Sequence, residues 1–126
     1  MSKLSDLRAQ VRLRANYACE FCGVTETDAG GQLTIDHYQP KSKGGNDELS
    51  NLLYCCVCCN QYKHAYWPSQ PESPKIWNPL VDSTAIHFLE VEEDKLFPLT
   101  KIGSFTIERL RLNRPSLVAH RKDKRR

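Results

Sequence analysis

Apolar positions in the first half of the chain recur with two different periods. Over residues 3–16 they recur at roughly helical spacing, which predicts an N-terminal helix. Residues 33–37 include the β-branched Thr34 and Ile35 and alternate between apolar and polar positions, which predicts a strand. A short helix is expected over residues 60–66, and Pro68 would stop it because proline cannot continue a helix. The first half is therefore expected to combine short helices with a strand.

The second half is punctuated by prolines and ends in two helical patterns. Residues 67–80 are expected to form an extended connector because prolines interrupt them. The apolar segments 86–91 and 95–99 flank an acidic turn and favour a β-hairpin. Helices are expected over residues 102–112 and 115–122, the second with a proline in its first turn. The whole pattern predicts a small α+β fold with a C-terminal extension of a hairpin and helices.

Composition limits the class of protein. The chain has 126 residues, 40% of them hydrophobic, and a mean hydropathy of −0.56, which allows one domain with a modest core. No apolar run approaches the roughly 20 residues that span a bilayer, so no membrane partner is expected. The N-terminus has no apolar signal segment, so a cytoplasmic location is expected. In that compartment six cysteines favour metal binding over disulfides.

Basic residues gather near the two ends of the chain, although the net charge is only +3. The last eighteen residues carry a single acidic residue, Asp123, among many Lys and Arg residues. Such a charge distribution suits a phosphate backbone, and a solubilising tail is the alternative interpretation. The candidate nucleic-acid contacts in this region are Arg109, Arg111 and Arg114.

Two Cys-x2-Cys turns carry the strongest chemical signal in the chain. They are formed by Cys19 and Cys22 and by Cys56 and Cys59. Two such turns are typical of a tetrahedral zinc site with four thiolate ligands. A second frame, Cys55 and Cys58, overlaps the latter turn. The frame of Cys56 and Cys59 is preferred because Cys59 directly precedes Asn60.

Several polar residues between and after these turns suggest a second, reactive metal. A phosphodiesterase with one divalent cation needs a carboxylate and another ligand on the metal, and a general base for water. Asp36 and His37 are adjacent at the end of the predicted strand, so their side chains diverge. Asn60 is expected to open the short helix, and His64 follows four residues later on the same helical face.

Three motifs in this region occur in a characteristic order: LTIDHYQPKSKGG at 33–45, LSNLL at 49–53 and CVCCNQYK at 56–63. With the cysteine turns, they give residues 17–66 a resemblance to the HNH endonuclease family. That family has the ββα-metal, or His-Me finger, fold, and many of its members carry zinc knuckles. Because Asn60 stands where the family often has histidine, the chain resembles an HNN variant.

The resemblance implies a role for each motif residue. His37 would be the general base that activates water, and Asp36 and Asn60 would hold a catalytic cation. Asn51 would tie down the loop between the strands and orient His37. Asn60 offers an oxygen ligand, which suits Mg²⁺ or Mn²⁺. In some members a further metal-binding histidine follows four residues later, so His64 is a candidate third ligand.

The sequence therefore predicts an endonuclease that cleaves DNA, with RNA as an alternative substrate. A structural zinc ion would stabilise its fold, and a second metal ion would take part in catalysis. Lys63 is expected to contact phosphate. All of residues 1–126 are assigned to one nuclease domain, made of an N-terminal helix over 1–16, an HNH core over 17–66 and an extension over 67–126. The alternatives are a non-catalytic zinc-knuckle module that binds nucleic acid, and a protein-interaction adaptor. Neither alternative needs Asp36 and His37.

Overall fold

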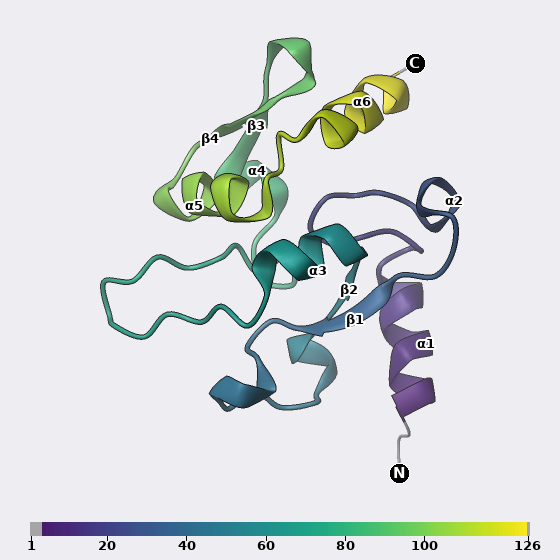
Figure 1. The fold of residues 1–126 in the computed structure, drawn as a ribbon, viewed down its shortest axis with the longest axis vertical. Helices are drawn as coiled ribbons and strands as arrows, with labels where there is room; N and C mark the ends of the chain where they lie inside the picture. The colour runs from purple at the N-terminus through teal and green to yellow at the C-terminus, as the bar shows by residue number, and fades with distance from the viewer. Residues whose placement is uncertain (1–3, 126) are drawn as a thin grey trace. The chain divides into compact units, whose positions relative to one another are not determined.

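The computed structural model describes residues 4–125, with side chains described from residue 6 onward. It forms two compact units, Met1–Trp67 and Pro68–Arg126 (Figure 1). Each unit combines helices with a two-stranded antiparallel sheet, which confirms the predicted α+β class. The assignment of both units to one nuclease domain stays a prediction. No helix within the described residues is long and apolar enough to cross a membrane.

The first unit carries the cysteine turns and all three motifs. Its elements are α1 (Leu4–Arg14), α2 (Glu26–Ala29), β1 (Thr34–His37), the 3₁₀ turns η1 (Lys41–Lys43) and η2 (Leu49–Asn51), β2 (Leu52–Cys55) and α3 (Val57–Lys63). The expected N-terminal helix and the strand are present, although residues 1–3 lie outside the described part of the chain.

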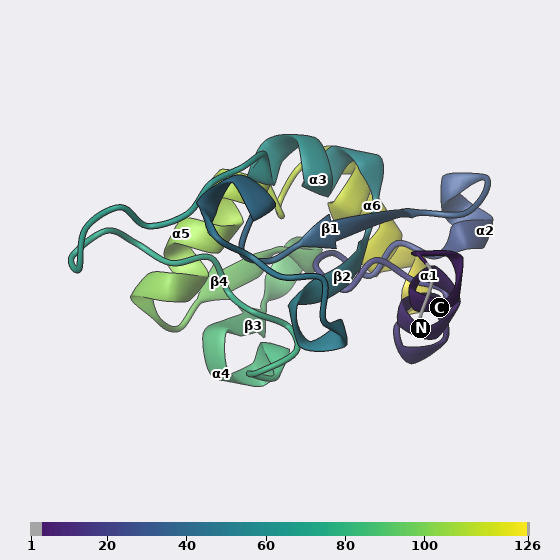
Figure 2. The ribbon, with the colours of Figure 1, turned by 90° about the horizontal axis from the view of Figure 1, so that it is seen from below.

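The core of this unit is built on the hairpin of β1 and β2. The strands pair antiparallel with Asp36 opposite Leu53 and His37 opposite Leu52. Every residue of β2 is buried. Helix α3 packs against β1 and α1 against β2, as the second view illustrates (Figure 2). The hairpin therefore presents Asp36 and His37 at the end of β1, close to α3, which contains Cys59 of the second cysteine turn.

Helix α3 begins at Val57, so the prediction that Asn60 opens it is wrong. The physical reason is a cap that the pattern did not reveal. The sulfur of Cys56 accepts a hydrogen bond from the backbone N–H of Cys59 at 3.4 Å, which starts the helix one turn earlier. The helix ends at Lys63 rather than at residue 66, because His64 adopts a positive φ of 53°.

A partly buried ion pair joins α1 and α2 to the sheet. Arg12 contacts Glu26 with its Nε and Nη2 atoms at 2.6 and 2.8 Å. The hydroxyl of Tyr54 donates to the same carboxylate at 2.5 Å and accepts from the backbone of Leu33 at 2.9 Å. The hydrogen bonds from Arg12 and then Tyr54 lower the pKa of Glu26 to about 2. The ionised form of Glu26 is therefore favoured by the fold.

We expect Glu26→Gln to destabilise the protein at neutral pH but not in strong acid. The folded state holds the pKa of Glu26 below its ordinary value, so this contribution is present above about pH 4.5 and is lost as the pH falls towards about 2. Urea unfolding at several pH values would measure it. Glu48→Gln, at an exposed carboxylate, is the control. If the free energy of unfolding of the Glu26 variant stayed below that of the wild type by the same amount down to pH 2, the expectation would be contradicted.

The second unit consists of α4 (Thr84–His87), β3 (Phe88–Glu90), the 3₁₀ turn η3 (Glu92–Asp94), β4 (Leu96–Pro98), α5 (Lys101–Leu110) and α6 (Pro115–Lys124). The expected hairpin and both helices are present. The first strand is shorter than predicted because His87 belongs to α4. Its buried ring contacts Asp82 at 2.9 Å and Thr100 at 2.6 Å, which turns the chain inward before the strand begins.

The preceding connector, residues 68–80, contains no helix or strand, as the prolines indicate. It nevertheless contributes to the core of the second unit through Trp77. The backbone N–H of Trp77 donates to Thr106 at 2.8 Å, and its ring packs edge-on against Phe88 at 5.2 Å between centroids. The core also contains the buried side chains of Leu110 and Leu117.

Candidate functional site

Four cysteine sulfurs meet between the two Cys-x2-Cys turns. The Sγ atoms of Cys19, Cys22, Cys56 and Cys59 all lie within 4.8 Å of one another, and those of Cys22 and Cys56 are 3.7 Å apart. Zinc–sulfur bonds of about 2.3 Å at tetrahedral angles require sulfurs about 3.8 Å apart. The four cysteines are therefore positioned to bind a metal ion, and their donor set and spacing fit zinc.

Each cysteine turn is held by a backbone hydrogen bond to its own first sulfur. The N–H of Cys22 donates to Cys19 Sγ at 3.4 Å, and the N–H of Cys59 donates to Cys56 Sγ at 3.4 Å. Hydrogen bonds from Cys22 and the other thiols hold the pKa of Cys19 well below its usual value, whereas the bond to Cys19 raises the pKa of Cys22. Thiols this close cannot all ionise without a cation among them.

The structure distinguishes the two overlapping cysteine frames. Cys56 and Cys59 are buried members of the cluster. Cys55 is buried at the end of β2, where its thiol donates to the carbonyl of Cys56 at 3.4 Å, and Cys58 is exposed. The cluster thus contains the frame that the sequence favoured, while Cys58 lies on the surface of α3.

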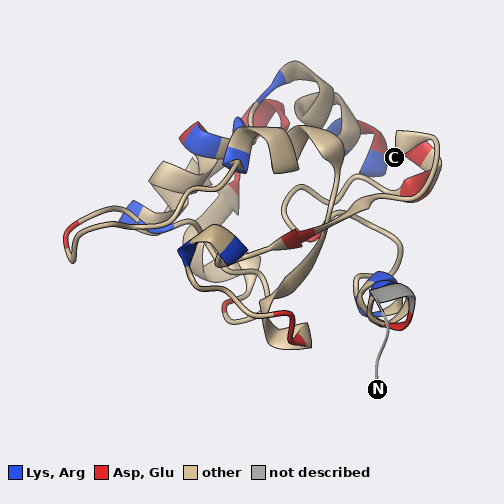
Figure 3. Cartoon of the chain, turned by 60° about the horizontal axis from the view of Figure 1, so that its bottom comes forward, with Lys and Arg blue, Asp and Glu red and all other residues tan. Residues whose placement is uncertain are grey.

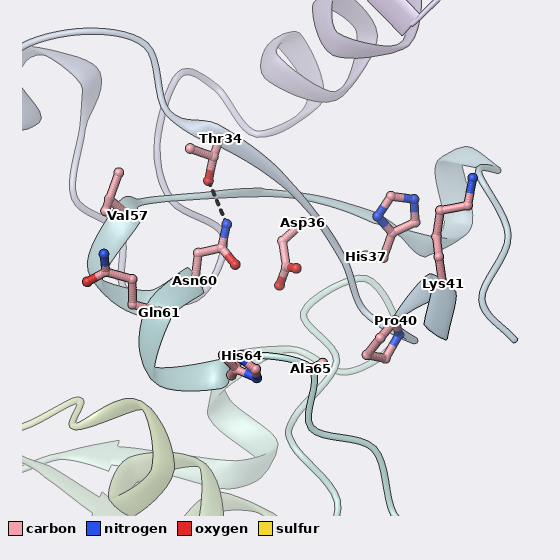
Figure 4. Close-up of a pocket in the computed structure, with 10 residues that line it drawn as sticks. All are labelled: Thr34, Asp36, His37, Pro40, Lys41, Val57, Asn60, Gln61, His64 and Ala65. Carbon is pink, nitrogen blue, oxygen red and sulfur yellow. Dashed lines mark hydrogen bonds between the residues drawn. The ribbon is translucent and has the colours of Figure 1, made fainter. Parts of the chain in front are cut away.

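A pocket of about 540 Å³ lies beside β1 and α3. Asp36, His37, Lys41, Asn60 and His64 are among the residues that line it, and Figure 4 shows them around a common space. The structure therefore brings together the candidate base, both candidate metal ligands and the candidate third ligand. They come from the end of β1, the turn η1, helix α3 and the residue that follows it.

Asp36 lines this pocket and forms an ion pair with the buried side chain of Lys63. Its Oδ2 is 3.1 Å from Nζ of Lys63, and the two side chains are 13% and 0% exposed. Lys63 also donates to the carbonyl of His37 at 2.8 Å. Within residues 4–125 the buried Oδ2 has no hydrogen-bond partner in good geometry. Burial raises the pKa of Asp36, and the charge of Lys63 opposes that shift.

Lys63 therefore lies in the interior rather than on the surface. The phosphate contact expected for it would require the side chain to leave its place below Asp36 and to give up the hydrogen bond to His37. Sequence spacing gave no sign of this, since lysines are almost never fully buried unless they are paired. The structure instead shows Lys63 joining the two consecutive residues at the end of β1.

Asn60 is oriented by its neighbour on β1. The hydroxyl of Thr34 donates to the carbonyl of Cys55 at 2.7 Å, so its oxygen can only accept from Asn60. The atom of Asn60 that lies 3.2 Å from this oxygen is accordingly Nδ2. The amide oxygen is then directed towards Asp36, as Figure 4 shows. The two oxygen donors needed for a hard cation face each other across the pocket.

His37 has a partner outside the family motifs. Its Nε2 lies 2.7 Å from Oδ1 of Asp47, whose Oδ2 lies 3.0 Å from Nζ of Lys41. The hydrogen bond with His37, followed by that with Lys41, lowers the pKa of Asp47. Sequence reasoning missed Asp47, because nothing in its local pattern distinguishes it from an ordinary loop carboxylate.

Asn51 closes the loop that carries Asp47. Its Oδ1 accepts from the backbone of Gln39 at 2.9 Å, and its Nδ2 donates to the carbonyls of Gln39 and Asn46 at 3.1 and 2.9 Å. Gly45 fits against the same segment: a Cβ there would lie 1.7 Å from the carbonyl oxygen of Gln39. Asn51 thus joins the two sides of the loop, and its expected effect on the orientation of His37 stays a prediction.

The basic candidates outside the motifs lie in the second unit. Arg109, Arg111 and Arg114 stand at and after the end of α5, and Arg114 donates to the carbonyl of Leu110 at 2.9 Å. Positive φ at Arg111 ends this helix. Figure 3 shows Lys and Arg on several elements of both units rather than on one helix alone.

Residues 19–66 match the family described as HNH endonuclease. This match confirms the resemblance, and the matched stretch contains the four clustered cysteines together with Asp36, His37, Asn51 and Asn60. No curated protein and no solved structure matches the chain significantly. The match indicates a nuclease-type or nucleic-acid-related function.

Proposed function

We propose that this protein is a metal-dependent endonuclease that hydrolyses phosphodiester bonds in DNA. One observation carries the proposal: the oxygens of Asp36 and Asn60 and the imidazole of His37 border one pocket, within the segment that matches HNH endonucleases. A carboxylate, a second oxygen ligand and a neutral base are the groups that one-cation phosphodiester hydrolysis requires.

The cysteine cluster is proposed to hold a structural zinc ion. Four thiolates saturate a tetrahedral zinc ion and leave no open position for substrate, so this site is structural rather than catalytic. The position of the cysteine cluster in the sequence links it to the pocket. Cys59 is a buried member of the cluster, and the next residue, Asn60, faces the pocket. Fixing Cys59 therefore fixes a candidate ligand of the second metal.

The residues of the pocket fit a second cation of a different kind. Asp36 Oδ2 is buried with Nζ of Lys63 at 3.1 Å, and the amide oxygen of Asn60 is directed towards Asp36. Both are hard oxygen donors, which suit Mg²⁺ or Mn²⁺. When bound, such a cation stabilises the negative charge that develops on the phosphate and on the leaving oxygen. His64 lines the same pocket and is a candidate further ligand.

The remaining steps are assigned to the chain's own residues. His37 accepts a proton from the attacking water, and the charge of Lys63 favours the ionised form of Asp36 against the effect of burial. Lys41 lines the pocket beside His37 and carries a positive charge that attracts the phosphate. Arg109, Arg111 and Arg114 remain proposed contacts to the nucleic-acid backbone, which would add affinity without sequence preference.

Plasmid cleavage in Mg²⁺ or Mn²⁺ tests this function. His37→Ala is expected to lower the cleavage rate by about 10²–10⁴-fold, because general-base catalysis contributes that much. His120→Ala, a histidine on α6 in the second unit, is the matched control and should cleave like the wild type. Binding of DNA by the wild-type protein without cleavage in any of several metals would favour the non-catalytic module instead.

Gly45→Ala is expected to lower cleavage by about 10²-fold while the zinc content stays unchanged. The added Cβ collides with the carbonyl of Gln39, so the loop clamped by Asn51 must shift, and small displacements of a catalytic base cost about that much. Cleavage rates and zinc content of the purified variant measure both parts. Gly31→Ala is a control for loss of a glycine outside this loop, since nothing lies within 4 Å of a Cβ there and any strain from its φ of 159° acts away from the pocket. Normal cleavage by the Gly45 variant would contradict the proposed role of the loop.

A further inference from the structure

We propose that Asp47 is the positioning residue of the general base: it holds the Nε2–H of His37 and thereby presents Nδ1 to the pocket. This inference rests on the proposed function, in which His37 accepts a proton from water. It goes beyond that proposal because it names the ring nitrogen that does so and the side chain that selects it.

Both oxygens of the Asp47 carboxylate are engaged by groups that line the pocket. Oδ1 lies 2.7 Å from Nε2 of His37, and Oδ2 lies 3.0 Å from Nζ of Lys41. Two contacts in different directions restrict the rotation of the carboxylate, although the side chain is 55% exposed. A single exposed ion pair would hold it only weakly. The bridge between two pocket residues gives Asp47 a defined place beside the imidazole.

Hydrogen bonds hold the backbone directly before and directly after Asp47. Asn51 donates to the carbonyl of Asn46 at 2.9 Å, directly before Asp47. The side chain of Asn46 accepts from the N–H of Glu48 at 3.0 Å, directly after Asp47. The close fit of Gly45 against Gln39 restricts the same loop. Asn51 thus acts on His37 through Asp47, which gives a physical route for the orienting effect expected of the middle motif residue.

The chemistry of the contact sets the tautomer of the base. An ionised carboxylate only accepts hydrogen bonds, so the nitrogen that faces Asp47 must carry the proton. In a neutral imidazole the other nitrogen, Nδ1, is then unprotonated and can accept a proton from water. Figure 4 shows one ring nitrogen of His37 on the side of Lys41 and the other on the side of Asp36. The nitrogen left for catalysis therefore faces the candidate metal ligands.

A comparison of two variants that each remove one negative charge, Asp47→Asn and Glu48→Gln, tests this inference. Asp47→Asn is expected to lower kcat by about 10²-fold with KM unchanged, because the base is misoriented while substrate contacts remain. Glu48→Gln removes an equal charge from the same turn and is expected to cleave like the wild type. Equal kcat values for both variants and the wild type would overturn the proposal. Equal losses in both variants would also overturn it, because they would reflect loop charge alone.

Nitrogen-15 NMR of the zinc-loaded protein, labelled at histidine and measured where the His37 ring is neutral, provides a readout without substrate. We expect the wild type to show the Nε2-protonated tautomer, and Asp47→Asn to shift the population towards Nδ1–H, because an amide can also donate to Nε2. An unchanged tautomer in Asp47→Asn would overturn the inference. If the wild type cleaves no DNA, the proposed function fails, while this measurement still decides whether Asp47 orients His37.

Discussion

Cys59→Ser is expected to abolish zinc binding and to unfold the unit Met1–Trp67. Cys59 is fully buried at the start of α3, and its backbone N–H bonds the sulfur of Cys56. Structural zinc sites contribute about 10–16 kcal/mol in small domains, whereas whole domains are stable by only about 5–15 kcal/mol. Losing the zinc ion together with one of its thiolates therefore removes more free energy than this small unit is expected to supply from its hairpin and helices.

Zinc content per chain and circular dichroism would measure this effect, with Cys58→Ser as the matched control. Cys58 lies one residue away on the same helix but is exposed and outside the cluster, so its variant is expected to keep zinc and fold normally. Chelation of zinc from the wild type should reproduce the Cys59→Ser spectrum. Retention of zinc by Cys59→Ser together with its loss from Cys58→Ser would show that the other cysteine frame binds the metal.

The sequence was most informative where chemistry depends on residue type and spacing. Two Cys-x2-Cys turns predicted a tetrahedral set of sulfurs, because the tight turns bring both thiols of each pair to one side. Alternation over residues 33–37 predicted the strand, and the order of the motifs predicted that Asp36, His37 and Asn60 would meet. Each of these inferences depends on local geometry or on a family pattern rather than on the direction of long side chains.

The sequence was least informative about partners that approach from another segment. Nothing local predicts that Lys63 turns inward, since that depends on where Asp36 lies after the hairpin has packed on α3. Asp47 meets His37 across a ten-residue loop whose closure depends on the side chain of Asn51. The early start of α3 likewise follows from a thiol acting as its cap, which propensity does not describe.

Lys63→Met is expected to be among the most destabilising substitutions that leave the cysteine cluster intact. Methionine fills much of the same apolar space but removes the cation 3.1 Å from Asp36 and the donor to the carbonyl of His37. Removing one partner of a buried ion pair typically costs about 3–5 kcal/mol, because the remaining charge stays buried without compensation. Lys43→Met, at an exposed lysine in the neighbouring turn η1, is the matched control and should change stability little.

A double-mutant cycle with Asp36→Asn separates the ion pair from the rest of the lysine's packing. Once Asp36 is neutral, the loss of the ammonium no longer leaves a buried charge, so Lys63→Met should cost less in that background than in the wild type. The free energies of unfolding in urea of the four proteins measure the difference. Additive losses would mean that the two charges do not interact. The ion pair would then have no part in holding Asp36, and the buried lysine would be explained by its bond to His37 alone.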